Sequence, residues 1–509
     1  DPRKWLVLAS MCFGLGMLMI DTFVVNVALP SISRDFQADL SRTQWVVSAY
    51  VLAVAVLPVS TGRVGDIFGR RRVYLIGLAL FILTSALAAL APNIETLIVV
   101  RALQGVGGAV MMPGTLSIIT QAFPARQRGL AIGIWGGVSG LGLIAGPLLG
   151  GLLVNSGSWR LIFIVNLPVG ALAILAAWLF VTESRDETAR RSLDWPGLAT
   201  LSSGLLLVML ALTRGDSAGW VSAQTLASAI GGFALLVLFV QLERRASAPL
   251  IDLSLFRSGT FVAASLSAFL FSAAVFGSQP YVSLFMQNFW EFTPLQGGLA
   301  FIPATVLVAL LMPLSGIIGQ RLGHRLRLLL ILASALVVVS GVVLLNIQAD
   351  DGYVRGLLPS FVLRGLGIGL FMSASSFAVV SSVPLAKSGL ASGTLAMSRN
   401  IGTAVGVALL GAVHLRHVRT TIEGAAAPGS DLEPAITAAG NFVVDGPSEL
   451  LAIAEDAIVV GFVQIALATV ALSLIAGIAS SRIRLLPRPP ATAPTNTTST
   501  PEPARAAIR

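Results

Sequence analysis

Charged residues are scarce in this chain. Only 11% of its 509 residues are Asp, Glu, Lys or Arg, whereas 55% are hydrophobic and the mean hydropathy is +0.86. Soluble domains carry about 25% charged residues, so this composition excludes a soluble protein and indicates one that crosses a membrane many times. The net charge of +9 then reflects arginines in cytoplasmic loops, and we expect no nucleic acid partner.

Lysine is nearly absent. The chain has two lysines, Lys4 and Lys387, and 31 arginines. The residues before the two lysines are Arg3 and Ala386, so neither lysine follows a glycine. A phosphate-binding P-loop needs a Gly-Lys pair, so the sequence contains no P-loop. The energy for any transport must therefore come from an ion gradient or from a partner ATPase.

Cysteine and histidine are also rare. Cys12 is alone, which excludes an intrachain disulfide. His324, His414 and His417 lack metal-ligand spacing, and we expect all three in loops. No nucleophile–base pair indicates an enzyme. We therefore expect no enzymatic activity, no metal and no cofactor, and we expect no cleavable signal peptide.

Long apolar runs fill most of the chain. Crossing a bilayer takes about 20 apolar residues in a helix. We count fourteen such runs and predict an all-α membrane protein with fourteen transmembrane helices, centred on residues 6–30, 44–62, 73–91, 95–122, 129–155, 160–181, 195–213, 223–243, 260–289, 296–319, 327–347, 355–381, 389–413 and 457–480.

The arginines set the predicted orientation. With the N-terminus inside, the cytoplasmic segments hold 23 of the 33 Lys and Arg residues, the outer loops hold 7, and three lie within spans. The positive-inside rule then places both termini in the cytoplasm. The long connection 414–456 falls outside, where we expect a loop or short amphipathic pieces. We expect the Pro- and Thr-rich tail 487–509 to be disordered.

A basic, glycine-rich motif occurs twice. Residues 62–72 read GRVGDIFGRRR, and residues 316–326, GIIGQRLGHRL, repeat its glycines 254 positions later. Likewise, RALQGVG at 101–107 is repeated as RGLGIG at 364–369. We therefore predict two equivalent six-helix bundles at 1–182 and 259–486, with an inserted helix pair and its flanking loops at 183–258. Repeats of this kind place a substrate cavity at their interface near the membrane midplane.

These motifs resemble the major facilitator superfamily, and in particular its fourteen-helix drug:proton antiporters of the EmrB/QacA type. The resemblance covers nearly the whole chain and includes GLIAGPLLGG at 142–151, DTFVVNVALP at 21–30, Trp159-Arg160 and Asn166 to Pro168. It implies the major facilitator fold, alternating access, the proton as coupling ion, a monomer in the bacterial inner membrane, and contact with lipids and small amphipathic substrates. The second glycine motif departs from the family pattern, because Gln320 stands where the first has Asp66.

Asp21 is the one carboxylate that we place well inside a span, and an intramembrane acid indicates function. It lies nine residues before Pro30, about 13 Å below the outer end of its helix. Arg101 enters its span from outside and lies about 10 Å down, so the two can meet. The resemblance implies that Asp21 is the proton site and Arg101 its regulator. The alternative is that Asp21 only neutralises Arg101.

The first glycine motif supplies candidate gate residues: Gly62, Gly65, Asp66, Gly69 and Arg70. Its glycines allow tight turns and close helix approach, and Asp66 would bind the opposite bundle on the inner side. The alternative is that the arginines of this loop only direct membrane insertion.

In span 5 the antiporter motif supplies Gly142, Gly146, Pro147 and Gly150. Small residues permit close packing and a proline bends a helix, so this span is suited to rock during alternating access. The alternative is that these glycines serve packing alone.

Arg364 and Arg399 lie within predicted spans, and no acid of the second half is placed to pair with them. They either bond to backbone carbonyls and cavity water or attract an anionic substrate or headgroup. Weaker candidates for substrate contact are polar and aromatic residues expected to face the cavity, although membrane aromatics more often pack or face lipid. They are Asn26, Gln44, Trp45, Gln104, Trp135, Gln279, Tyr281 and Asn400.

The leading functional prediction is a proton-coupled multidrug efflux antiporter for amphipathic, hydrophobic or monocationic compounds. A second keeps the fold but exports an endogenous lipid, a siderophore or an anionic metabolite, and the buried arginines favour it. A third prediction is a membrane receptor or scaffold that does not transport. Asp21 argues against it, because a scaffold has no use for an acid inside the membrane.

Overall fold

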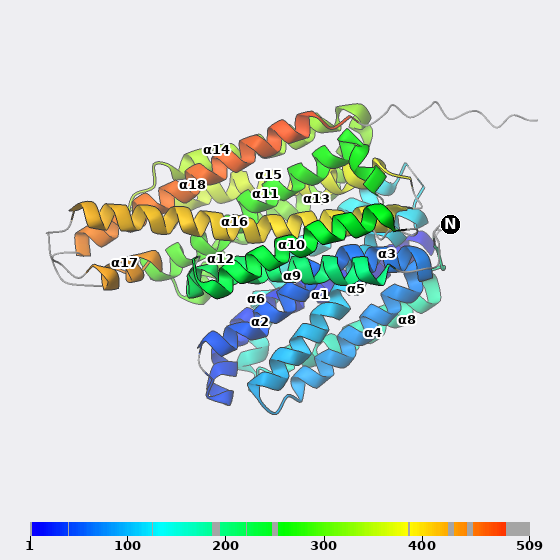
Figure 1. The fold of residues 1–509 in the computed structure, drawn as a ribbon, viewed down its shortest axis with the longest axis horizontal. Helices are drawn as coiled ribbons and strands as arrows, with labels where there is room; N and C mark the ends of the chain where they lie inside the picture. The colour runs from blue at the N-terminus through cyan, green and yellow to red at the C-terminus, as the bar shows by residue number, and fades with distance from the viewer. Residues whose placement is uncertain are drawn as a thin grey trace, which may run out of the picture.

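The computed structural model of the protein describes residues 3–38, 40–124, 126–185, 194–219, 221–246, 253–384, 387–425, 432–444 and 451–484. Within these ranges the chain is helical and contains no strand, which confirms the all-α prediction. Figure 1 shows most helices running side by side along the long axis of the molecule. We call the end at which α1 begins the inner end, and the opposite one the outer end.

The first bundle contains six spans. Its helices are α1 (Arg3–Phe36), α2 (Leu40–Val56), α3 (Pro58–Phe68), α4 (Arg70–Ala89), α5 (Ile94–Ala122), α6 (Arg128–Asn155), α7 (Leu161–Ile164) and α8 (Asn166–Phe180). A 55° bend divides the second span where Pro58 begins α3, because proline lacks the N–H that would continue α2. Asn93 caps α5 by accepting a hydrogen bond from the Thr96 N–H at 2.9 Å.

The inserted pair consists of α9 (Trp195–Ala218) and α10 (Ala223–Arg245). The second bundle follows with the short turn η1 (Leu253–Arg257). Its helices and remaining turns are α11 (Gly259–Leu284), η2 (Phe285–Phe289), α12 (Pro294–Ala300), α13 (Ile302–Leu322), η3 (Gly323–Arg325), α14 (Leu326–Leu344), η4 (Tyr353–Leu357), α15 (Leu358–Ser381), α16 (Ser388–Ala425), α17 (Glu433–Gly440) and α18 (Leu451–Ser481).

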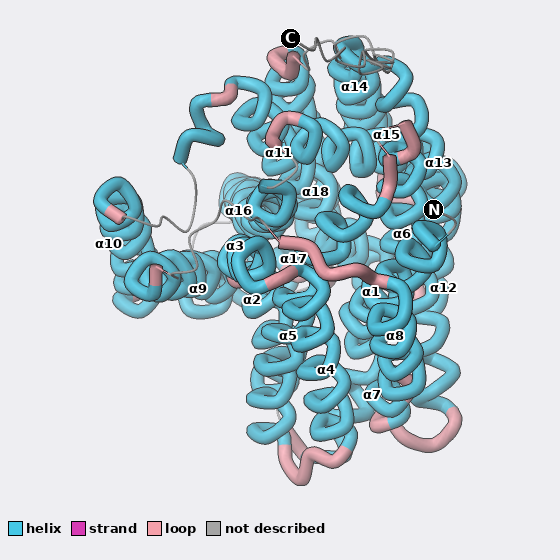
Figure 2. The backbone as a smooth tube through the Cα atoms, turned by 90° about the vertical axis from the view of Figure 1, so that its right-hand side faces the viewer, coloured by secondary structure: helices cyan, strands magenta, loops and turns pink. Residues whose placement is uncertain are grey.

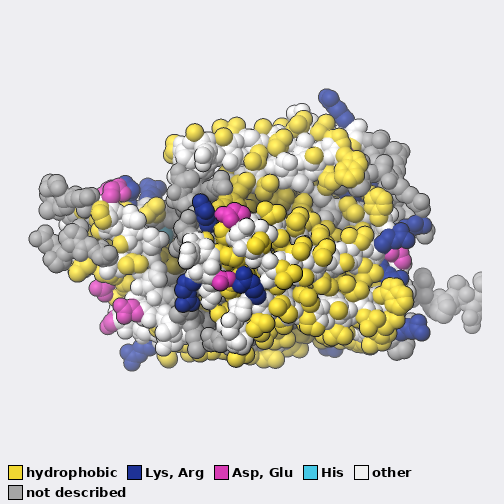
Figure 3. Space-filling model, turned by 90° about the horizontal axis from the view of Figure 1, so that it is seen from below, with side chains coloured by type: hydrophobic (Ala, Val, Ile, Leu, Met, Phe, Trp, Pro, Cys, Tyr) yellow, Lys and Arg dark blue, Asp and Glu magenta, His cyan; other side chains and the backbone are white. Residues whose placement is uncertain are grey.

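Each of the fourteen predicted runs coincides with a helix or a bent helix pair. Among the described residues, twelve helices are long and apolar enough to cross a membrane, or thirteen if α2 and α3 form one span. Outside that count, α6 is 28 residues long and carries one charged residue, Arg128. Figure 3 shows the corresponding surface, a broad band of hydrophobic side chains with charged groups toward the ends.

The prediction of an outer loop at 414–456 is wrong for its first part. The prediction that His414 and His417 lie in loops is wrong as well. α16 continues to Ala425 and contains both histidines. The helix persists because His414, Val418 and Ile422 recur every four residues and form a buried face, near which α17 packs. His324 lies in the turn η3, as expected for a connection. Residues 426–431, 445–450 and the tail 487–509 lie outside the described residues.

The two bundles pack against each other through α6 with α13 and through α3 and α5 with α16. In Figure 1 their inner ends meet, whereas the outer ends of α2 and α16 lie apart. The inserted pair packs beside this junction, because α9 contacts α2 of the first bundle and α16 of the second (Figure 2).

Candidate functional site

Asp21 and Arg101 form an ion pair in the interior of the first bundle, as their similar predicted depths allowed. Arg101 Nη1 lies 2.6 Å from Asp21 Oδ2, and both side chains have no exposed surface. Two amide groups also donate to Asp21 Oδ1, Gln104 Nε2 at 3.2 Å and Asn166 Nδ2 at 2.8 Å. Four helices, α1, α5, α8 and α4, meet here, since Ser85 of α4 accepts from both amides. Every side chain that bonds to the Asp21 carboxylate is a hydrogen-bond donor.

Aromatic rings enclose the arginine. Its guanidinium carbon lies 4.1 Å from the ring centre of Tyr50 and 5.6 Å from that of Phe163. Arg101 Nε donates to the Val46 carbonyl at 3.2 Å. A guanidinium over an aromatic face is attracted by the ring quadrupole. The ion pair is therefore closed off from water, and removing either charge would leave the other buried and uncompensated.

Sequence reasoning missed two members of this network and misplaced a third. Asn166 and Ser85 were not expected at the site, although Asn166 opens the family-like string at 166–168. Gln104 was predicted to face the substrate cavity. Instead it is fully buried and bonds to Asp21, Ser85 and Arg101, whose Nη1 donates to its Oε1 at 2.7 Å.

The antiporter motif packs on α1 at either side of Asp21. A Cβ at Gly146 would lie 2.5 Å from the Phe23 Cβ, and one at Gly150 would lie 3.1 Å from the Val24 carbonyl. Gly142 abuts Met19 in the same way. These glycines therefore let α6 approach the helix that carries the acid. The side chain of Pro147 lies outside what the structure describes.

Asp66 connects the two bundles at the inner end. Its Oδ2 accepts from the Leu390 N–H at 3.0 Å, in the first turn of α16, while Arg70 Nη2 bonds to Oδ1 at 2.6 Å. Gly62 lies beside this contact, where a Cβ would be 2.7 Å from the Gly389 carbonyl oxygen. We call the Asp66–Leu390 contact the inner latch. The unpaired N–H groups of a helix start attract a carboxylate, so the latch favours bundles that are closed at this end.

The other two glycines of the motif, Gly65 and Gly69, differ in whether the structure leaves room for a side chain. Gly69 adopts φ +110°, and a side chain there would strike the carboxylate of Glu183. That carboxylate accepts from the N–H groups of Arg71 and Arg72, both at 3.1 Å, and so caps α4. Gly65 has room, with its nearest neighbour atom at 3.9 Å.

The second glycine motif makes the matching contact without a charge. Gln320 Oε1 accepts from the Gly129 N–H at 3.0 Å, at the start of α6. Thus each motif reaches the first turn of a helix in the opposite bundle. Replacement of Asp by Gln keeps the acceptor but removes the negative charge, so this contact is weaker than the inner latch.

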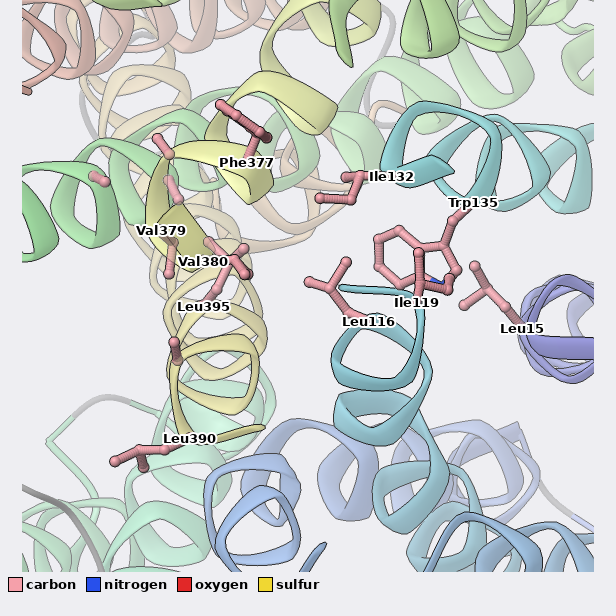
Figure 4. Close-up of a cluster of buried hydrophobic side chains, with 14 of the residues drawn as sticks. Leu15, Leu116, Ile119, Ile132, Trp135, Phe377, Val379, Val380, Leu390 and Leu395 are labelled. Carbon is pink, nitrogen blue, oxygen red and sulfur yellow. The ribbon is translucent and has the colours of Figure 1, made fainter. Parts of the chain in front are cut away.

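A buried apolar cluster closes the space between the bundles next to the inner latch. Trp135 of α6 and side chains of both bundles belong to one cluster of buried residues, of which Figure 4 labels ten. The first bundle contributes Leu15, Leu116, Ile119, Ile132 and Trp135; the second contributes Phe377, Val379, Val380, Leu390 and Leu395. We call this group the inner seal. It excludes water from the inner side of the junction.

The residues predicted for substrate contact do not converge on one site. Asn400 lies between the bundles, where its Nδ2 donates to the Val54 carbonyl at 3.2 Å. Trp135 belongs to the inner seal and donates from Nε1 to Thr115 at 3.1 Å. Tyr281 is buried inside the second bundle and donates to the Val407 carbonyl at 2.7 Å. Trp45 and Gln279 are half-buried. The side chains of Asn26 and Gln44 lie outside what the structure describes.

The two arginines within spans of the second bundle, Arg364 buried and Arg399 half-buried, bond to backbone carbonyls, as one of the two alternatives expected, and also to serine hydroxyls. Arg399 Nη2 donates to the Met372 carbonyl at 2.8 Å and to Ser375 and Ser376 of α15 at 2.8 and 2.9 Å. Arg364 donates to the Val275 carbonyl and to Ser278 of α11.

Asp35 fixes the outer end of α1 to the family-like pair before α7. Its carboxylate accepts from Arg160 Nη1 at 2.7 Å and from Trp159 Nε1 at 3.0 Å. The hydrogen bonds from Arg160 and Trp159 hold the pKa of Asp35 below its usual value of 3.8. The carboxylate side chain is 44% exposed, so this pair adds little to stability.

Comparison with known proteins agrees with this architecture. The family model of the Major Facilitator Superfamily matches residues 11–407. The chain belongs to the major facilitator superfamily. Membership makes it a membrane transporter rather than an enzyme, as the sequence predicted.

Relatives of this transporter include named resistance and export proteins. It is 37% identical over 424 residues to the multidrug resistance protein Stp of Mycobacterium tuberculosis, covering 83% of this chain and 78% of that one. It is 33% identical over 465 residues to the tetracenomycin C resistance and export protein of Streptomyces glaucescens, covering 91% and 83%. The human organic anion transporter MFSD10 shares the fold, with a TM-score of 0.62, 16% identity and coverage of 94% and 100%.

Proposed function

We propose that this transporter is a fourteen-helix drug:proton antiporter that exports amphipathic, hydrophobic or monocationic compounds. We further propose that it works as a monomer in the bacterial inner membrane with both termini in the cytoplasm. Relatives at 37% and 33% identity carry names of multidrug resistance and antibiotic export, which supports efflux. The observation that carries proton coupling is the fully buried Asp21, held by Arg101, Gln104 and Asn166.

The geometry suggests how a proton acts. Protonation of Asp21 removes the negative charge opposite Arg101 and weakens the attraction between α1 and α5. Because α6 packs closely on α1 through Gly146 and on α13 through Gly133, a shift of α1 reaches the opposite bundle. The inner latch and the inner seal separate in the inward-facing state, where substrate enters and the proton leaves.

The test uses purified protein in liposomes under an imposed pH gradient, with a panel of monocationic and neutral amphipathic dyes. Asp21→Asn should abolish both gradient-driven transport and proton release on substrate binding, because the amide cannot exchange a proton. Asp35→Asn is the matched control, since Asp35 lies on the same helix but at its exposed outer end. Proton-driven transport at the native rate in Asp21→Asn would refute the coupling role.

A second candidate cargo is a compound that the cell itself makes. The name of the Streptomyces glaucescens relative, which couples resistance with export of tetracenomycin C, supports it. Drug susceptibility and the extracellular metabolite profile of a deletion strain separate the two. Hypersensitivity with an unchanged profile supports multidrug efflux, whereas loss of one secreted compound without hypersensitivity supports dedicated export.

A further inference from the structure

The second bundle contains a counterpart of the Asp21 network that lacks the acid. Arg364 opens the repeated motif in α15 as Arg101 opens it in α5. Each arginine donates to the first helix of its own bundle, Arg101 to Asp21 in α1 and Arg364 to Ser278 in α11. A neutral hydroxyl therefore occupies the place of the carboxylate.

The surroundings of the two arginines correspond as well. In the first bundle α4 contributes Ser85 and α8 contributes Asn166. In the second, the equivalent helices α14 and α18 contribute Ser340 and Thr469, which line one cavity with Ser278 and Arg364. Two bundles with the same framework thus differ by one negative charge.

The cavity beside Arg364 is small and closed in by apolar side chains. It has about 10 Å³ open to the centre of a water-sized sphere, which is room for one water or one small ion. Val282, Leu344 and Phe462 complete its wall and leave no space for a drug-sized molecule. The hydroxyl groups of Ser340 and Ser360 form a hydrogen bond of 3.1 Å, in which either can be the donor. This bond orients the Ser340 hydroxyl in the cavity wall.

Two polar groups at this cavity have no partner within the described part of the chain. They are Nε of Arg364 and Oγ1 of Thr469, both of them buried atoms. Arg364 is 7% exposed and Thr469 is 6% exposed. Moreover, no acidic side chain of the described residues bonds to Arg364. A buried guanidinium without a counter-charge is costly in a membrane interior, and guanidinium and hydroxyl groups both supply hydrogen-bond donors.

We propose that this cavity binds one small monovalent anion, of the size and charge of chloride. The anion supplies to Arg364 the negative charge that Asp21 supplies to Arg101. It receives hydrogen bonds from Arg364 Nε and from the hydroxyl of Thr469. The first bundle thus carries a built-in carboxylate that exchanges a proton, and the second carries a diffusible anion that does not. This site lies within one bundle and is separate from the junction at which substrate is transported.

Thermal unfolding of the purified full-length protein in detergent tests the proposal. Sodium chloride or bromide replaces sodium gluconate at constant ionic strength, since gluconate is too large for the cavity. We expect a saturable rise of about 2–5 °C with either halide and none with gluconate. Bromide bound in crystals should give an anomalous peak beside Arg364 and Thr469.

Two variants make the outcome decisive. Ser278→Asp installs a carboxylate beside Arg364, as Asp21 stands beside Arg101, and should remove the halide response while the protein stays folded. Arg364→Gln should remove the response by deleting the cation. The proposal is overturned if the native protein unfolds at the same temperature in chloride and in gluconate, which would mean that the cavity holds water. It is equally overturned if Ser278→Asp responds to chloride as the native protein does.

Discussion

Substitution of Asp66 by asparagine isolates the charge of the inner latch. The bond from Arg70 to Asp66 lies within the first bundle, between α4 and α3, whereas the bond from the Leu390 N–H to Asp66 crosses between the bundles. We therefore expect only the Leu390 bond to break when the inner end opens. Asparagine keeps the acceptor oxygen and the size. A negative charge at a helix start contributes about 0.3–2 kcal/mol, and a charge-assisted hydrogen bond is about twice as strong as a neutral one.

We therefore expect Asp66→Asn to destabilise the inner-closed state by about 1–2 kcal/mol, which lowers the ratio of closed to open molecules about 5- to 30-fold. Spin labels on Phe68→Cys and Ser381→Cys report this ratio, because both residues are exposed at the inner ends of opposite bundles. Cys12, the single native cysteine, is replaced by serine in this background.

In the native background one distance between the labels should dominate, and in Asp66→Asn a second, longer distance should gain population. Transport should fall in parallel, while membrane insertion is retained because every arginine of the loop remains. The control is Asp35→Asn, which removes a carboxylate far from the junction. An unchanged distance distribution in Asp66→Asn would show that the charge does not hold the bundles together, and the topology role of the loop would then stand.

Three further predictions follow from the same geometry. Gly62→Ala should impair transport, because its Cβ would press on a backbone carbonyl 2.7 Å away, whereas Gly151→Ala, with nothing within 4 Å, should transport normally in the same assay. Asn166→Ala should lower the free energy of unfolding by about 1–3 kcal/mol, since Asp21 loses one donor in a buried site; an unaltered melting temperature would contradict this. Asp35→Asn should lower the free energy of unfolding by no more than about 1 kcal/mol. Because the folded-state pKa of Asp35 is lowered, that contribution is present above the usual pKa of 3.8 and is lost as the pH falls through the folded-state value, so native and variant melting curves should converge in strong acid.

The sequence predicted the ion pair because depth in a membrane helix follows from residue number. Asp21 and Arg101 are far apart in the sequence. Even so, the rise per residue of a helix and the positions of the span ends place both residues at a similar depth in the membrane. The same reasoning could not identify Asn166 or Ser85, because a neutral polar residue in a span carries no signal of its partner. Gln104 was misassigned for that reason, since depth alone does not tell which side of α5 faces the other bundle.

The partners of the two glycine motifs were also hidden in the sequence. Asp66 was expected to reach the opposite bundle, but its partner is the backbone N–H of Leu390, and every residue except proline carries such a group. The contact from Gln320 to Gly129 was hidden for the same reason. The predicted span for α16 was too short because the outer part of this helix carries charged residues on its surface. Its buried residues there, such as Val418 and Ile422, occur only once per helical turn and so form no continuous apolar run.

The position of the inserted pair has a consequence for movement. α9 touches α2 of one bundle and α16 of the other, so it cannot follow both when they rotate relative to each other. In the proposed transport cycle, at least one of these two contacts would have to slide or break, and the helix pair would restrain the movement of the bundles on that side of the transporter. The two sides of the junction are therefore unequal, because α9 connects the bundles on one of them.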